Sequence, residues 1–519
     1  MVGCGDPPCK ARREIAFAVS PWDQDHPDWQ AIDQRLPTGH LARRISAGVE
    51  LLDLGALEQS YEGRGSLPLP PELLLKVALY EMASGKPSPA QWFRDTRECD
   101  TVQWLAQGLQ PSRTVCYDFW YRIAPFVGAW NQQVLHAAVE HGLTSVERVA
   151  QDGTAIAACA SRHRLVNQAT LSRRCSELDA AVIADERGEQ PETLHGWMAR
   201  HPDTRLRQQE RYKRATQRME HLQAENQRRR ASKRQKPEKI VVSVSDPDAA
   251  CGRDKLGVFR PLYNVQFHRD LDSPFLVGYE VFAQNHDTGT LLPLVERTVE
   301  LTGHKPQILL ADSSYASVLD LAACQQHQIT LYAPISANDF SIQQQRRPQT
   351  NQFTQLPKSA FTWQPEAQTY LCPAGQRLEL QSQGWVPRHG GQELRTYKFH
   401  CSPDHCCTCP LRATCTPRPE QGRTVTRLEH EELLEELRTR MSTPEAKALY
   451  RLRCQTVELA FADLKEHRSL RRFCSRGRPL AQSQVGIVVL VHNLVTLLKS
   501  SDGRLDHARP SRTLEKMNC

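Results

Sequence analysis

The sequence predicts a mixed α/β protein, and three observations predict this class. From Trp22 to about Ile123, apolar residues recur at spacings of three and four, which is typical of helices. From Val146 onward the pattern changes to short runs rich in β-branched and aromatic residues, which is typical of strands. Helical stretches at 290–301 and 317–325 follow some of these runs. A mixed sheet covered by helices accounts for this order.

The N-terminal part is predicted to be a compact helical domain over residues 22–140, after a disordered N-terminus over 1–21. A proline-rich breaker at 67–71 precedes residues with clear helical spacing, namely Leu73, Leu74, Val77, Ala78 and Glu81. Bulky side chains follow that could anchor a core.

Residues 141–340 are predicted to form the first part of the sheet core. The predicted strands cover 146–150, 240–244, 262–267, 275–282, 307–310 and 329–332. Asp152 and Asp312 each end an apolar run, so both are expected at strand ends, where ligands commonly bind in open sheets. Taken singly, either residue could instead serve as a turn or helix cap.

A basic helical insertion is predicted over residues 200–238. Its one weak apolar stripe consists of Tyr212, Ala215, Met219 and Leu222. Its end is densely positive, with three arginines at 228–230 and a Lys-Arg pair at 233–234. Two interpretations stay open: a solvated helical arm, or a contact to the DNA backbone.

Residues 341–428 are predicted to form a polar, Gln-rich and Cys-rich insertion without a long periodic segment. Four thiols are candidates for a tetrahedral structural zinc site, a zinc knuckle: Cys372, Cys406, Cys409 and Cys415. Cys401 and Cys407 compete for the same roles, and a Cys-rich loop in a reducing cell can also stay free of metal.

Helices are predicted to resume over residues 429–500, followed by a disordered tail over 501–519. The longest apolar stretch, 485–498, is interrupted by His492, Asn493 and Thr496, so it is predicted to be too short and too polar to span a bilayer.

The overall composition limits the classes of function that this chain can have. A chain of 519 residues with 39% hydrophobic composition is expected to form two to four structural units. The net charge of +7 makes nucleic acid a plausible partner. The first twenty residues lack the apolar run of a signal peptide, and the 17 cysteines are mostly scattered singly. We therefore expect a reducing, cytoplasmic location.

Three acidic residues have settings that suit phosphoryl transfer on DNA. That chemistry uses two divalent metals, so several carboxylates must converge from different elements. Asp152 and Asp312 are expected beside the sheet, whereas Glu458 is expected on a helix. Glu458 and Lys465 are seven residues apart, so one helix face could present both an acid and a base.

The string Tyr450-x-x-Arg453-x-x-x-Val457-Glu458-x-x-Phe461-x-x-x-Lys465 resembles the Tyr-Arg-Glu-Lys signature of insertion-sequence DDE transposases. Other landmarks of that family occur in the expected order, at Asp152-Gly153-Thr154, 245–249, 263–266, Asp312-x-x-Tyr315 and 492–494. The N-terminal segment, including 108–112, is similar to the helical domain that precedes the catalytic core in these transposases. Two positions depart from the family pattern, because Ser314 replaces the usual Gly and Cys159 stands where Asn is common.

The resemblance implies a ribonuclease-H-like catalytic core with a helical N-terminal domain. Asp152, Asp312 and Glu458 would bind two Mg²⁺, or Mn²⁺, in that core. It also implies hydrolysis of DNA at the element's ends, followed by attack of the freed 3′-hydroxyl on target DNA.

The same resemblance implies that Tyr450, Arg453 and Lys465 hold phosphates of the terminal DNA. The expected partners are the terminal inverted repeats of the element and its target DNA, bound by a homodimer.

Two other functions fit the same features less well. A catalytically inactive, domesticated transposase would keep the fold and the basic surfaces, but all three carboxylates are present. A host nuclease with the same core would not need the Tyr-Arg-Glu-Lys helix.

Overall fold

The computed structural model describes residues 15–63, 65–229, 231–335, 356–387 and 392–500. The predicted disordered tail at 501–519 and most of the predicted disordered N-terminus lie outside the described residues. Helices and sheets occur together, so the predicted mixed α/β class is confirmed.

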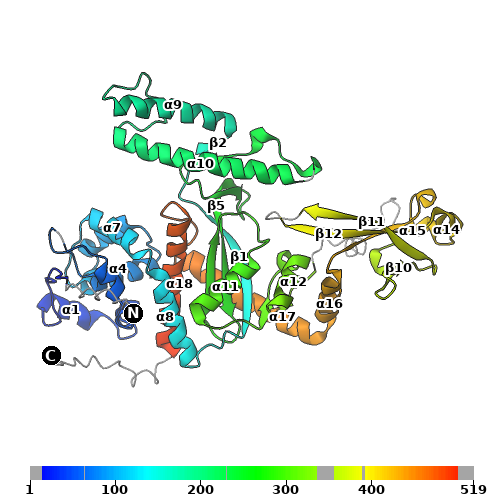
Figure 1. Ribbon diagram of the computed structural model, residues 1–519. Helices are drawn as coiled ribbons and strands as arrows, with labels where there is room; N and C mark the ends of the chain where they lie inside the picture. Colours follow the sequence, from blue (N-terminus) through cyan, green and yellow to red (C-terminus); the bar gives the residue numbers. More distant parts are fainter. Residues whose placement is uncertain (1–14, 64, 230, 336–355, 388–391, 501–519) are drawn as a thin grey trace, which may run out of the picture.

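The N-terminal part is helical, as the spacing predicted (Figure 1). Its helices are α1 (Pro27–Arg35), α2 (Leu41–Glu50), α3 (Gly55–Gln59), α4 (Pro71–Ala83), α5 (Pro89–Glu98), α6 (Asp100–Ala106), α7 (Arg113–Ile123) and α8 (Val127–Glu140). Almost every residue of α4 is buried, which makes it the central helix of this part.

A six-stranded sheet forms the core of the molecule. Its strands are β1 (Arg148–Ala157), β4 (Ala250–Arg253), β5 (Phe259–Asp270), β6 (Leu276–Phe282), β7 (Ile308–Leu310) and β8 (Thr330–Tyr332). The order is β4-β5-β1-β7-β8, and β6 also pairs with β5. The central strand β1 runs antiparallel to β5 and parallel to β7.

Helices α11 (Leu291–Thr302) and α17 (Pro444–Ala462) cover opposite faces of this sheet. Adjacent residues of a strand point to opposite faces. Phe267 packs against Phe461 of α17, whereas the neighbouring His268 bonds Thr298 of α11. The edge strand β8 is covered by α12 (Val318–Gln326) and α16 (Glu431–Ser442).

Helix α18 (Arg478–Ser500) joins the N-terminal helices to the sheet, because it packs against α2, α4 and α8 as well as β6 (Figure 1). It is longer than the apolar stretch 485–498 on which the membrane prediction rested. By length and composition this helix could cross a membrane, contrary to that prediction. In this structure, 83% of its most apolar window is buried inside the protein.

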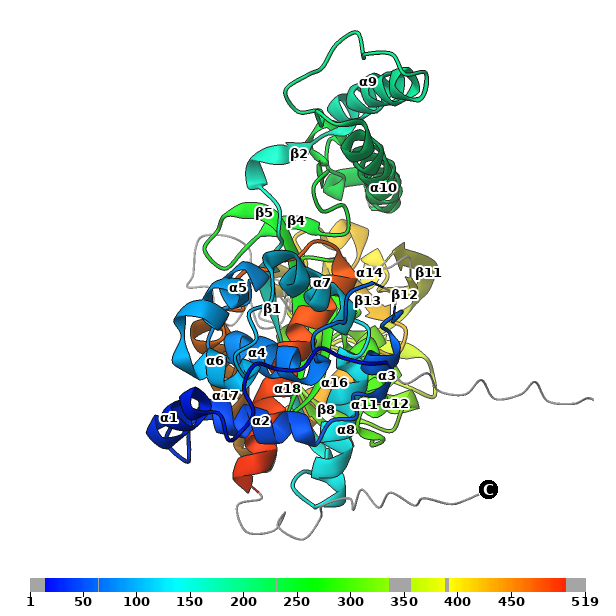
Figure 2. The same ribbon diagram turned by 90° about the vertical axis from the view of Figure 1, so that its left-hand side faces the viewer.

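The basic insertion is larger than predicted and forms a two-helix arm that stands away from the rest of the molecule in both views (Figures 1 and 2). Its elements are β2 (Leu165–Val166), α9 (Gln168–Glu186), α10 (Pro202–Arg228) and β3 (Val242–Ser243), with short 3₁₀ turns at Arg162–Arg164, Ala231–Lys233 and Pro237–Lys239. The strand predicted at 240–244 pairs only with β2, so its assignment to the main sheet was wrong. Its apolar side chains instead fill a separate core under α9 and α10.

A second, five-stranded antiparallel sheet follows the main sheet, in the insertion where the sequence predicted no long periodic segment. Its strands are β9 (Thr362–Gln364), β10 (Thr369–Leu371), β11 (Arg377–Pro387), β12 (Glu393–His400) and β13 (Thr424–Leu428). Polar and apolar residues alternate only over Arg377–Gln381 of β11, and the polar stretch Gln381–Gln383 that follows is exposed, so the strand pattern is short. Three further short elements lie beside this sheet, a 3₁₀ turn at Lys358–Ala360 and the helices α14 (Pro403–Thr408) and α15 (Arg412–Cys415).

Candidate active site

The strand register places Asp152 and Asp312 beside each other. Ala150 of β1 is aligned with Leu310 of the parallel strand β7, and each aspartate follows its aligned residue by two positions. Neighbouring strands lie about 5 Å apart, so the two residues lie beside each other where β7 ends. Asp312 follows its strand, as predicted, whereas Asp152 lies within β1 and not at its end. Asp152 is therefore on a central strand, as expected, but its predicted place at a strand end was wrong, because β1 continues through the Gly153-Thr154 segment, paired with β5.

Asp312 is held by the turn that follows β7. Its Oδ1 accepts hydrogen bonds from the backbone N–H of Ser314 at 2.7 Å and from the Ser314 hydroxyl at 2.5 Å. These bonds cap the 3₁₀ turn Ser313–Tyr315. The capping role and a ligand role are compatible, because a carboxylate has a second oxygen.

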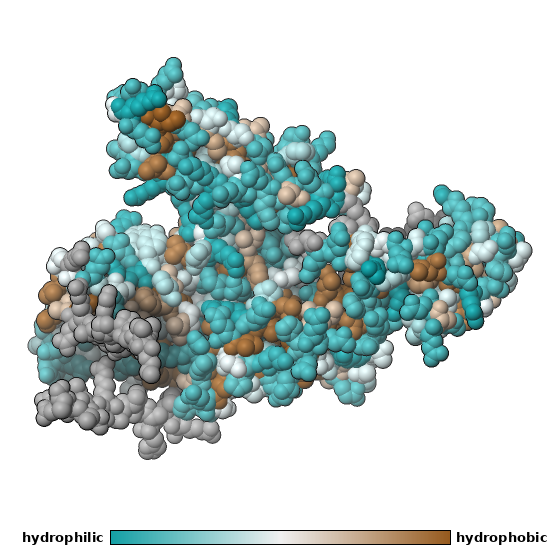
Figure 3. Space-filling model, viewed as in Figure 1, coloured by the Kyte–Doolittle hydropathy of each residue, from teal (hydrophilic) through white to brown (hydrophobic). Residues whose placement is uncertain are grey.

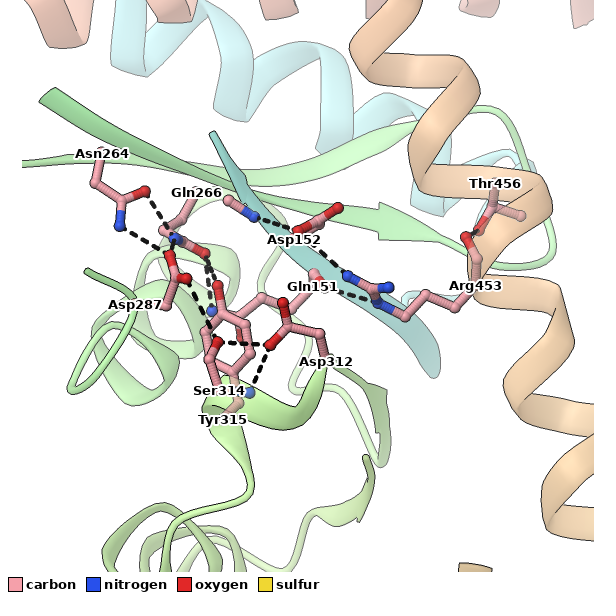
Figure 4. Close-up of polar contacts among 11 residues, drawn as sticks. Gln151, Asp152, Asn264, Gln266, Asp287, Asp312, Ser314, Tyr315, Arg453 and Thr456 are labelled. Atoms are coloured by element: carbon pink, nitrogen blue, oxygen red, sulfur yellow. Dashed lines mark hydrogen bonds and ion pairs between the residues drawn. The ribbon is translucent and has the colours of Figure 1, made fainter. Parts of the chain in front are cut away.

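Helix α17 brings the motif residues to this pair (Figure 4). The Arg453 guanidinium lies 3.2 Å from Asp152 Oδ1, and its Nε donates to the Gln151 carbonyl at 3.4 Å. Lys465 lies in the π-helical turn Asp463–His467 that continues α17, and it donates to the Thr154 hydroxyl. Two basic motif residues therefore contact the strand that carries Asp152.

Tyr450 lies near Arg453 and Asp312, and burial raises its pKa. Glu458 belongs to α17, but its side chain lies outside the described residues. The structure thus brings together Asp152, Asp312, Tyr450, Arg453 and Lys465.

The electrostatics of this cluster follow from burial and like charges. Burial raises the pKa of Asp152 and Asp312 raises it further, while Arg453 and the Gly153 N–H oppose the shift. Burial, together with Lys255 and Arg471, lowers the pKa of Lys465 to about 8. The site holds two acids that repel each other and a lysine that titrates close to neutral pH.

A polar network that the sequence did not predict lies next to Asp312 (Figure 4). Asp287 Oδ1 accepts from Asn264 at 2.9 Å and from Gln266 at 2.8 Å. Its Oδ2 lies 3.4 Å from the Ser314 hydroxyl that also donates to Asp312. The sequence offered one signal for this network, because polar residues stand at alternate positions of β5. These residues are Asn264, Gln266 and His268, and all three are buried. Asp287 had no such signal, because it lies in the loop after β6.

Carboxylate oxygens suit Mg²⁺ or Mn²⁺, and the paired aspartates provide them. Among the described residues, no three His, Cys, Asp or Glu side chains are grouped so that they could hold a metal ion. The described side chains supply two of the three predicted ligands, since that of Glu458 lies outside them.

The candidate zinc ligands gather elsewhere, at the end of the second sheet. One small cavity is lined by five thiols, those of Cys372, Cys401, Cys406, Cys409 and Cys415. The Gln376 backbone N–H points at Cys372 Sγ from 3.3 Å. Cys407 is exposed and does not line this cavity, so the fifth thiol is Cys401.

Two segments of the chain match known protein families. Residues 30–120 match a family described as "Transposase domain (DUF772)", and residues 371–498 match one described as "Transposase DDE domain". The second match includes the strands β11 to β13 of the second sheet, α17 and most of α18. No curated protein matches the chain. Two separate segments of the chain are therefore similar to transposase domains, one of them of the DDE type.

Proposed function

We propose that the chain is an active DDE transposase. It hydrolyses DNA at the ends of its insertion sequence and joins the freed 3′-hydroxyl to target DNA. The main supporting observation is the alignment of Asp152 and Asp312 on adjacent strands, beside the helix that carries the Tyr-Arg-Glu-Lys motif.

Asp152, Asp312 and Glu458 would hold two Mg²⁺ or Mn²⁺ ions in this proposal. Such a metal pair, when bound, activates the attacking oxygen and stabilises the leaving oxygen. The donor set fits, because Asp152 is partly buried next to a second carboxylate and a cation would relieve that repulsion.

Tyr450, Arg453 and Lys465 would hold phosphates of the terminal DNA. Arg453 can form paired hydrogen bonds with a phosphate through its planar fork, whereas Lys465 acts as a point charge. Both lie beside Asp152, so a phosphate held by them would present its neighbouring phosphodiester to the carboxylates.

The proposed core is ribonuclease-H-like. Its support is a mixed sheet with a central strand that carries the first aspartate and with helices on both faces. We further propose that the protein acts as a homodimer on DNA, since two element ends must be held together, and that it works in the cytoplasm.

A structural zinc ion is proposed in the cysteine cavity. Zinc is the metal favoured where four thiolates can be arranged tetrahedrally. The N–H aimed at Cys372 Sγ and the nearby Arg423 would both stabilise thiolates. The sulfur atoms would draw together around the ion.

The test is cleavage of a DNA that carries the element's flanking repeats. We expect Mg²⁺-dependent cuts at the repeat ends for the natural chain and none for Asp152→Ala or Glu458→Gln. Each variant should still bind the same DNA in EDTA. Binding by the natural chain without any cleavage would reject the proposed activity and identify an inactive DNA-binding protein.

A further inference from the structure

A second basic site lies between the two-helix arm and the core. A cavity of about 460 Å³ opens there, and neither Asp152 nor Asp312 lines it. Its lining includes Arg164, Arg174, Arg211 and Arg476, and it contains no Asp or Glu. These residues come from distant parts of the chain, so the fold gathers the positive charge.

One carboxylate, that of Asp246, lies near Arg476, but it does not line the cavity. Within the described part of the chain, no salt bridge joins any of the four arginines to a carboxylate. Arg174 stacks over the Trp197 ring at 5.1 Å, and its Nε is buried without a hydrogen-bond partner among the described residues. Arg211 and Arg476 lie close enough to repel each other, which lowers the pKa of Arg211 beyond the effect of burial. Such a set of cations is stabilised by an anion.

The part of the arm that contains α10 is strongly basic. Residues 200–239 hold 14 Lys and Arg but 5 Asp and Glu, whereas the whole chain holds 66 and 59. The visible outer surface of the arm is largely hydrophilic (Figure 3). A long polyanion could therefore continue from the cavity toward the C-terminal end of α10, away from Arg207.

The cavity is connected to the active site through β1. Beyond Ala157, the chain reaches the 3₁₀ turn Arg162–Arg164, which lines the cavity. Ala157 lies roughly 17 Å from Asp152 along an extended strand, which equals about five base pairs of B-DNA.

We propose that this cavity binds backbone phosphates of the element's DNA, inside the element and apart from the cleaved bond. This inference rests on the proposed function and adds a second, internal contact to it. DNA is favoured over a free phosphate because the basic surface extends along the arm beyond the cavity.

The test measures binding of a fluorescein-labelled 30-base-pair duplex to the full chain in EDTA, over a range of salt concentrations. Arg211→Ala should weaken binding roughly tenfold, and should reduce the salt slope by about 0.9 for each phosphate that is no longer neutralised. Arg207→Ala is the matched control, because Arg207 is exposed one turn earlier on α10 and does not line the cavity. Arg211→Lys should restore part of the slope.

Hydroxyl-radical footprinting should show that Arg211→Ala loses backbone protection only inside the element. Equal effects of Arg211→Ala and Arg207→Ala would overturn the inference while leaving the cleavage result intact. Arg211-dependent binding of pyrophosphate with unchanged duplex binding would also overturn it, and would identify a free-anion site. No duplex binding by the natural chain would reject both this inference and the proposed function.

Discussion

Gly153 shows how one missing side chain shapes the candidate site. It is paired with Gln266 across β1 and β5, so a Cβ there would point to the α11 face. That Cβ would lie 2.0 Å from Gln266 Nε2 and 2.8 Å from Asp287 Oδ1. The polar network beside Asp312 therefore requires glycine next to Asp152.

Gly153→Ala should displace Gln266 and Asp287, and through Ser314 also Asp312. We expect at least a roughly tenfold loss of Mg²⁺-dependent cleavage, because small misplacements of catalytic groups are costly. DNA binding in EDTA should change little. Gly384→Ala is the control, since its Cβ would meet no atom closer than 3.8 Å. Equal cleavage by both variants would contradict the proposed role of the network.

Lys465 should make DNA binding sensitive to pH. Its pKa is lowered to about 8 by burial, Lys255 and Arg471, so it is charged below pH 8 and neutral above it. Binding that uses this charge should be strongest near pH 6.5 and weaken as pH rises through 8. Anisotropy titrations at constant ionic strength measure this.

Arg in place of Lys465 keeps its charge, so Lys465→Arg should abolish the decline between pH 7 and 9. An identical decline in Lys465→Arg would remove Lys465 from the phosphate-contact residues.

At the scale of elements, short turns determine which side chains meet. The cysteine cavity is assembled from the turn after β10, the end of β12 and the helices α14 and α15. The Cys406-x-x-Cys409 spacing was visible in the sequence, but Cys401 enters because β12 ends beside α14.

Zinc analysis of the purified chain should find about one ion per molecule. Cys409→Ser should lower both the zinc content and Tm, because metal binding contributes to folding. Cys407→Ser should change neither, since Cys407 is exposed outside the cavity. Absence of zinc from the natural chain, or equal effects of the two substitutions, would contradict a zinc site.

At the scale of the whole molecule, α18 connects parts that are far apart in the sequence. Asn131 of α8 donates to the Gly486 carbonyl of α18 at 2.9 Å, and Asn493 bonds both the N–H and the carbonyl of Leu276 on β6. The N-terminal helices and the sheet therefore share one hydrophobic core.

Gly486→Ala should destabilise this shared core. The added Cβ would lie 2.5 Å from the Tyr279 hydroxyl and 2.7 Å from Val127 Cγ1. Overpacking of this kind typically costs about 1–3 kcal/mol of unfolding free energy. Urea denaturation followed by circular dichroism measures the loss, and the exposed Lys499→Ala on the same helix serves as control. Unchanged stability would show that α8 and β6 can move apart at no cost.

Local patterns in the sequence were enough to predict the mixed α/β class, the helical N-terminal part and the positions of the candidate acids in the chain. These properties depend on periodicity and on motif spacing, which a single chain displays. Strand β11 was not predicted because most of its side chains are exposed. Such a strand lacks the long alternation of buried and exposed residues by which strands are recognised.

Only the folded structure shows which side chains contact one another. Asp287 joins the polar network through a loop, Cys401 enters the cysteine cavity through a strand end, and Arg476 reaches the arm from the segment before α18. Contacts between residues from different elements depend on strand register and helix packing, and no local pattern encodes either of these.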